Sequence, residues 1–128
     1  MVSEAVTHAF RVRVKAFFLP EHSDVEKKNF FWAYHIRITN EGETPATLLS
    51  RHWIITNGIG YVEEVKGPGV VGKQPRILPG ETFEYTSMCP LRTQYGTMEG
   101  TYHMRADDGE TFNVDINPFT LFVPALAN

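Results

Sequence analysis

Alternating apolar and polar side chains are the dominant pattern of this chain. The clearest example is residues 10–18, FRVRVKAFF, where every second side chain up to position 16 is apolar and those between are basic. Because successive side chains of a strand point to opposite faces, this spacing predicts a strand with one buried and one solvated face. The same spacing recurs at residues 30–38, 82–87, 98–105 and 112–116, with 119–123 as an extension. Residues 48–56 and 61–65 add an apolar run with mixed faces and a short strand.

Turn-forming residues separate these predicted strands. They are Asn40-Glu41-Gly42, Asn57-Gly58, Pro79-Gly80 and Asp108-Gly109. Each contains a residue that tolerates a positive φ, or a proline, whose ring fixes φ at a negative value. No stretch of ten residues has helical spacing, and the polar residues 20–29 predict a loop with at most one helical turn. About seven short strands with regular turns predict an all-β fold, an antiparallel β-sandwich like an immunoglobulin or fibronectin type III domain.

Composition restricts the function classes. The 128 residues favour one domain spanning 1–128, and 42% hydrophobic with 21% charged residues are typical of a folded, soluble protein. A formal charge of −3 argues against binding to DNA or to an anionic membrane surface. We expect a cytoplasmic protein, because Cys89 is the single cysteine and no secretory or membrane-spanning segment is recognisable.

Glycine and proline, the main turn-forming residues, are most concentrated in residues 65–75, VKGPGVVGKQP. This segment contains a G-x-G-x-x-G spacing at Gly67, Gly69 and Gly72. A dinucleotide-binding fold would need a helix after these glycines, and Pro75 and Pro79-Gly80 prevent one. Three interpretations stay open: a stiff crossover between strands with glycines at positive φ, an anion-binding loop, or a loop that docks onto a protein. In the second, backbone amides with Lys66, Lys73 and Arg76 would bind phosphate, pyrophosphate or a dinucleoside polyphosphate.

Longer strings carry a resemblance to a known family. Five segments of this chain resemble the ApaG family signature: RHWIITNG at 51–58, VEEVKGPGVVGKQP at 62–75, PGETFEYTS at 79–87, CPL at 89–91 and GTMEGTY at 96–102. The resemblance implies a fibronectin type III-like or immunoglobulin-like sandwich and, for bacterial members, a small cytoplasmic protein without an assigned reaction. The family name is associated with genes for a diadenosine-tetraphosphate hydrolase and an rRNA dimethyltransferase, and an older name with cobalt and magnesium handling.

The resemblance also bears on partners and on one turn. In eukaryotic proteins, among them an F-box protein and a DNA-polymerase-interacting protein, the similar domain looks like an interaction module. The chain departs from many members at Met88, where a Ser-Gly pair is expected. This departure bears on the shape of the turn expected after Ser87.

Candidate catalytic and metal-binding residues do not form recognisable motifs. The histidines, His8, His22, His35, His52 and His103, lack the spacing of metal ligands. Cys89 does not precede a helix that would lower the pKa of its thiol, and adjacent Glu63 and Glu64 would point to opposite faces of a strand. We therefore expect no catalytic residues, no metal site and no cofactor.

The sequence favours a non-enzymatic binding module that presents residues 67–74 and a basic face to a protein partner. The basic residues of that face are Arg11, Arg13, Lys15 and Arg37. The alternative is a small-ligand binder that uses Gly67, Gly69, Gly72, Lys73 and Arg76. The apolar C-terminal residues either complete the core or form a contact between two copies in a homodimer; they are Phe119, Leu121, Phe122, Val123 and Leu126.

Overall fold

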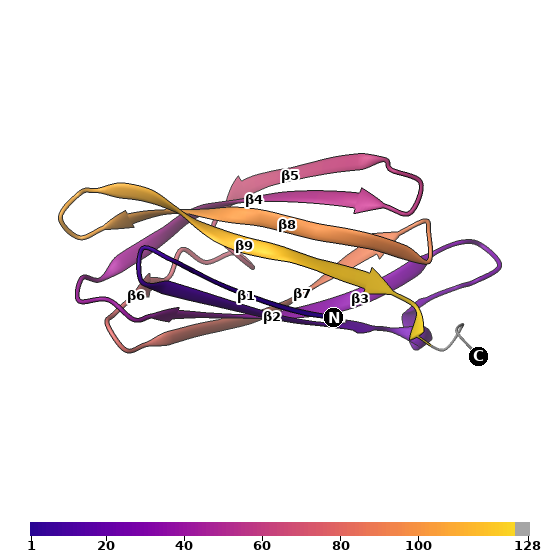
Figure 1. Cartoon of the computed structure of the whole chain (residues 1–128), viewed down its shortest axis with the longest axis horizontal. Helices are drawn as coiled ribbons and strands as arrows, with labels where there is room; N and C mark the ends of the chain where they lie inside the picture. The colour runs from indigo at the N-terminus through magenta and orange to yellow at the C-terminus, as the bar shows by residue number, and fades with distance from the viewer. Residues whose placement is uncertain (125–128) are drawn as a thin grey trace.

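Two antiparallel sheets face each other in the computed structural model, which describes residues 1–124 (Figure 1). The first sheet has the order β1-β2-β3-β7 and the second β5-β4-β8-β9, with the short β6 also paired to β4. The strands are β1 (Val2–Thr7), β2 (Phe10–Phe18), β3 (Phe30–Asn40), β4 (Ala46–Asn57), β5 (Val62–Pro68), β6 (Arg76–Ile77), β7 (Thr82–Leu91), β8 (Tyr95–Ala106) and β9 (Thr111–Phe122). The predicted all-β sandwich is confirmed.

The loop between β2 and β3 contains a short helical element. It is the 3₁₀ turn η1 (Pro20–His22), which begins at a proline, a residue whose fixed φ suits a first helical position. The prediction of a polar loop with at most one helical turn is therefore confirmed. Within residues 1–124, none of the helical segments has the length and apolar character needed to cross a membrane.

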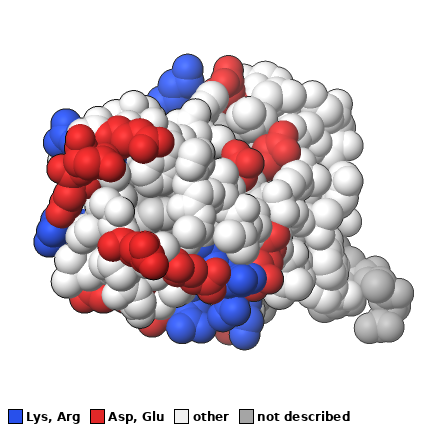
Figure 2. All heavy atoms as spheres, turned by 60° about the vertical axis from the view of Figure 1, so that its left-hand side comes forward, with Lys and Arg blue, Asp and Glu red and all other residues white. Residues whose placement is uncertain are grey.

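Charged residues on the outer face of the first sheet form ion pairs. Arg11 contacts both Glu4 and Glu41, at 3.1 and 2.8 Å, and Arg13 contacts Glu4 at 2.6 Å. The hydrogen bond from Arg13 lowers the pKa of the Glu4 carboxyl. Figure 2 likewise shows acidic and basic side chains next to one another on the side of the molecule at the left of Figure 1. The face predicted to be basic is therefore a face of mixed charge.

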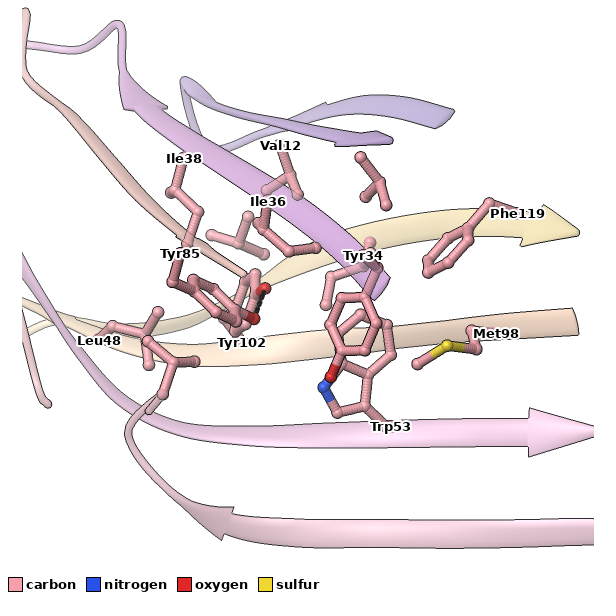
Figure 3. Close-up of a cluster of buried hydrophobic side chains, with 14 of the residues drawn as sticks. Val12, Tyr34, Ile36, Ile38, Leu48, Trp53, Tyr85, Met98, Tyr102 and Phe119 are labelled. Carbon is pink, nitrogen blue, oxygen red and sulfur yellow. Dashed lines mark hydrogen bonds between the residues drawn. The ribbon is translucent and has the colours of Figure 1, made fainter. Parts of the chain in front are cut away.

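The core lies between the sheets and follows the predicted alternation. Val12, Val14, Ile36 and Ile38 are at most 1% exposed, whereas the residues between them face solvent wholly or in part. The hydroxyls of Tyr85 and Tyr102, one from each sheet, are 2.5 Å apart and form a buried hydrogen bond (Figure 3). This bond satisfies two polar groups whose burial without a partner would be costly.

Two bulges change which side chains face the core. On β4 the register shifts between Leu48 and Ser50, so that Leu48 is buried before the bulge and Trp53 after it. On β9 the register shifts opposite Met98 and Gly100, so that Ile116 and Phe119 both face inward. A bulge inserts an extra residue and so reverses the phase of the alternation. This reversal explains the mixed faces of residues 48–56.

The C-terminal strand completes the core. Phe119 is 3% exposed and Leu121 is fully buried, whereas Phe122 is on the outer face at 42% exposed. Val123 packs partly against the core, and Leu126 lies outside the described residues. For Phe119 and Leu121, the first of the two alternatives, packing into the core, is therefore the one observed.

Three features of the strands differ from the predictions. The strand β1 was not expected, because its inward positions carry Ser3, Ala5 and Thr7, which give no apolar alternation. The two-residue β6 is too short for any pattern. No turn follows Ser87: β7 continues through Met88 to Leu91 because residues 88–91 pair with 30–33 of β3.

Candidate functional site

The two long sides of the sandwich differ. On one side β1 packs against β9, where the Asn117 side-chain amide donates to the carbonyl of Glu4 at 2.7 Å and the Asp115 amide donates to the Thr7 hydroxyl. On the other side the edge strands β5 and β7 are not paired with each other. A groove opens there between the sheets, in the form of two adjoining hollows of about 350 and 230 Å³ that share part of their walls.

Four residues line both hollows and so mark the centre of the groove. They are Tyr34 of β3, Arg51 and Trp53 of β4, and Ser87 of β7. The larger hollow continues beneath the loop at Val70–Gly72, and the smaller one continues along the first half of β5 to Glu63. The walls of the groove combine aromatic, aliphatic and polar side chains, and polar groups in a concave site of this kind can orient a ligand.

Arg51 is the central charge of the groove, and the bulge on β4 puts it there. Without the register shift after Leu48, position 51 would face solvent on the outside of the second sheet. In the structure, its Nη1 donates to the carbonyl oxygens of Pro68 and Gly69, both at 3.0 Å. Among the described residues, no carboxylate lies within 4.0 Å of this guanidinium. Its positive charge is thus held in place without being neutralised.

Gly67 makes room for this guanidinium. An added Cβ at Gly67 would lie 3.0 Å from Nη1 of Arg51, closer than nine in ten real Cβ contacts, so the guanidinium would have to shift. Gly67 lies inside β5, opposite Arg51 in the ladder, and its φ is not positive. The first glycine of the motif therefore serves the packing of a side chain rather than a turn.

Tyrosine hydroxyls surround the inner end of the groove. Tyr34 and Tyr85 line it, and Tyr102 lies behind Tyr85 (Figure 3). Burial raises the pKa of the Tyr34 hydroxyl, although a hydrogen bond with Ser87 and the charge of Arg51 act in the opposite direction. Burial likewise raises the pKa of Tyr85 and of Tyr102. These hydroxyls are therefore neutral hydrogen-bonding groups at physiological pH.

The other two glycines of the motif shape the loop after β5. Gly69 and Gly72 have φ of +59° and +78°, as the stiff-crossover interpretation requires, and the non-glycine residue Val71 has φ +44°. The Gly69 amide donates to the carbonyl of Leu49, and Val70 and Lys73 exchange reciprocal backbone hydrogen bonds at 2.8 and 2.9 Å. The loop is thus a fixed wall of the groove.

The three cations proposed for an anion site lie differently. Lys66 is exposed on β5 and Lys73 is exposed at the end of the loop. Arg76 of β6 pairs with Asp107 through two hydrogen bonds, one at 3.1 and one at 2.5 Å. Arg76 also lowers the pKa of the Asp107 carboxyl. The structure thus assembles the glycines with Arg51, a residue that the sequence interpretation missed. The available signal was a basic residue just before the apolar run 53–55.

Other titratable residues are engaged elsewhere. His35 contacts Glu84 at 2.9 Å, His52 contacts Glu64 at 2.7 Å, and residues 1–124 contain no group of three His, Cys, Asp or Glu side chains arranged to hold a metal ion. Burial, with a smaller effect from Glu63, raises the pKa of the Cys89 thiol to about 12. At neutral pH this thiol is protonated and therefore a poor nucleophile.

The fold and the groove define an immunoglobulin-like or fibronectin type III-like β-sandwich with one open side. The family described as the ApaG domain matches residues 20–106, and the chain belongs to this family. It is 51% identical over 127 residues to Protein ApaG of Anaeromyxobacter dehalogenans (strain 2CP-C), covering 99% of this chain and 100% of the relative. Protein ApaG of Bordetella pertussis (strain Tohama I) is 53% identical over 113 residues, 88% of this chain and 86% of that protein.

Solved structures agree with this assignment. A crystal structure of a Bordetella pertussis protein named ApaA superimposes with a TM-score of 0.88 at 52% identity, over 90% of this chain and 94% of that chain. An X-ray structure of a structural genomics target gives the same TM-score at 43% identity, over 95% and 92% of the two chains. The resemblance to the ApaG family is therefore confirmed.

Proposed function

We propose that this ApaG-family protein is a non-enzymatic module that binds a protein partner through the loop of residues 67–74 and the open side of the sandwich. The observation that carries the proposal is the exposure of the Val71 side chain on this loop. This apolar side chain is 52% exposed at the tip of a loop whose backbone is held on both sides by hydrogen bonds. An exposed apolar residue on a fixed loop suits recognition, because little conformational entropy is lost when a partner binds.

Electrostatics support binding rather than chemistry. The Cys89 thiol is protonated at neutral pH, and the glutamates beside His35 and His52 hold those rings on the outer faces of the sheets, away from the groove. Arg51, by contrast, offers an unneutralised charge inside the groove, where a partner group would be partly desolvated. Within residues 1–124, the groove therefore contains recognition groups and no assembled acid–base pair.

Site-specific photo-crosslinking tests the proposal. A benzophenone amino acid is placed at Val71 in cells that produce the protein and, as a matched control, at Val25, which has the same exposed fraction of 52%. Val25 lies in the loop between β2 and β3, away from the groove between β5 and β7. We expect a defined protein adduct at position 71 and none at position 25.

The adduct also identifies the kind of partner. An adduct of twice the mass of the chain would mean that a second copy of this chain is the partner, which is the outcome that a homodimer predicts. Equal labelling at both positions, or no adduct at either, would contradict the interaction module. The cytoplasmic location and the association with cobalt and magnesium handling remain predictions.

The alternative function, binding of phosphate or a polyphosphate nucleotide by the glycine loop, is favoured by one observation: the uncompensated Arg51 lies beside the loop. We rank it second, because three loop amides already donate to carbonyls and Arg76 pairs with Asp107. Titration with pyrophosphate, read from the backbone amide resonances of Gly69 to Gly72, tests it. Unshifted resonances at millimolar ligand would exclude the anion site.

A further inference from the structure

The groove contains two opposite charges at separate places. Arg51 lies at its centre, where the two hollows meet, and Glu63 lines the smaller hollow. Glu63 lies in the wall of the smaller hollow, opposite Met88 and Cys89 of β7, which line the same hollow. Among the described residues, neither charge has an oppositely charged side chain within 4.0 Å. This distinguishes the pair from Arg11, Arg37 and Arg76, each of which has a carboxylate partner.

The ladder between β4 and β5 fixes the spacing of the two charges. Glu63 is opposite Ile55, and Arg51 is four residues before Ile55 on the same strand. At about 3.3 Å per residue, the two positions are about 13 Å apart along the strand direction. This separation is too long for a direct ion pair, so both charges remain available to a ligand.

We propose that the groove binds an extended peptide segment of the protein partner that places an acidic side chain on Arg51 and a basic side chain on Glu63. In an extended peptide, side chains four positions apart point to the same side and lie about 13 Å apart, which matches the spacing of the Arg51 and Glu63 positions along the ladder. The inference rests on the proposed function, since it names the chemistry of the partner that the module recognises.

Backbone groups at the groove support an extended ligand. β5 and β7 lie at the ends of their sheets, and each has one edge that no other described strand covers. Free strand edges bind extended peptides through main-chain hydrogen bonds, and pockets for alternate side chains then provide specificity. The two hollows are such pockets, and Arg51 and Glu63 set their charge preference.

Selection from a displayed library of random dodecapeptides tests the inference. The library is selected on the full chain, on Arg51→Gln, on Glu63→Lys and on Arg37→Gln, a control variant in which an arginine of the outer face loses its contact with Glu84. On the unmodified chain and on Arg37→Gln, we expect enrichment of Asp or Glu four positions from Lys or Arg. Arg51→Gln should lose the acidic preference, and Glu63→Lys should exchange the basic preference for an acidic one.

Affinities of one selected peptide, labelled with a fluorophore, give the magnitudes. We expect Arg51→Gln to weaken binding at least about tenfold, because the arginine is partly buried and its contact with the ligand is desolvated. Glu63 is exposed, so its reversal to lysine should weaken binding by about threefold. Arg51 also donates hydrogen bonds to the carbonyls of Pro68 and Gly69, so Arg51→Gln is first checked for an unchanged melting transition. Glu63 is exposed, so Glu63→Lys tests the inference without a change in folding.

The outcomes separate this inference from the proposed function. Three results would each overturn the inference: enriched peptides that lack the two charges, unchanged preferences in both groove variants, or no enriched peptide at all. If Val71 then still forms a protein adduct while Val25 does not, the interaction module stands and only its recognition chemistry is wrong. If the adduct is absent as well, both fail.

Discussion

Replacing Gly69 with alanine tests whether the loop is built around a close approach of two backbone segments. Gly69 has φ +59°, and an added Cβ would collide with the backbone carbonyl of Lys73. Lys73 is fixed there by its reciprocal hydrogen bonds with Val70, whose side chain is 1% exposed. The collision therefore requires the loop to move and the reciprocal bonds to lengthen or break.

The expected cost follows from these contacts. A left-handed backbone costs an alanine about 1–2 kcal/mol, and each weakened hydrogen bond adds about 1 kcal/mol. The smaller entropy of the unfolded alanine chain returns about 0.4–1 kcal/mol. We therefore expect Gly69→Ala to lower the free energy of unfolding by about 2–4 kcal/mol.

Gly72→Ala is the matched control. Gly72 also has a positive φ, of +78°, but an added Cβ would have no atom within 4 Å. Only the backbone strain applies, so we expect a loss of about 1 kcal/mol after the gain from the unfolded state. In urea unfolding followed by tryptophan fluorescence, the midpoints of the two variants should differ by about 1 M. Coinciding midpoints would refute the reasoning, because the close approach to Lys73 would then have no energetic consequence.

Three further predictions concern the buried core, the Cys89 thiol and the free energy of unfolding at low pH. Leu121→Ala should cost about 2–5 kcal/mol because this side chain is fully buried. Phe122→Ala should cost only about 1 kcal/mol, because Phe122 is on the outer face and packs mainly against its ladder partner Tyr95; urea unfolding measures both. Cys89 should react with a thiol reagent at neutral pH only as the protein unfolds. Its pKa of about 12, rather than 9.0, leaves roughly 1,000-fold less of the reactive thiolate. Fast labelling of the folded protein would contradict the burial of this thiol. The carboxyl of Glu4 has a pKa below its usual 4.5 because of Arg13, so its contribution to stability is present above that value and disappears as the pH falls through the lowered pKa. The difference in urea midpoint between the unmodified chain and Glu4→Gln should therefore shrink on acidification.

The strand framework was predictable because burial on one face imposes a period of two on the sequence. The apolar inward residues of β2 up to Ala16 and of β3 up to Ile38 could be identified from their spacing, and the structure buries them. Asn40, which was assigned to a turn, is instead the buried last residue of β3. The strand β1 escaped prediction for the converse reason. It pairs with β2 over its whole length, yet its inward side chains are small or polar, so pairing rather than apolar burial holds it.

The candidate site was only half predictable. The glycine motif marked the correct loop, and two of its glycines have the positive φ that a crossover needs. The role of Gly67 depends on a neighbour from another strand, since only the ladder with β4 brings it against the Arg51 guanidinium. Lys73 and Arg76 follow the motif in sequence, yet Arg76 instead pairs with Asp107 in the turn after β8.

The sequence by itself determined the class of fold, the family and the position of the loop, because these depend on local spacing and on an ordered string of residues. The tertiary structure alone decided which side of the sandwich is open and which charge lies there. A single bulge on β4 turns Arg51 from the solvent face into the groove, and Glu63 joins it from β5. Register is a property of paired strands, so the phase of a bulged strand, and with it the chemistry of the groove, is set only when the sheets assemble.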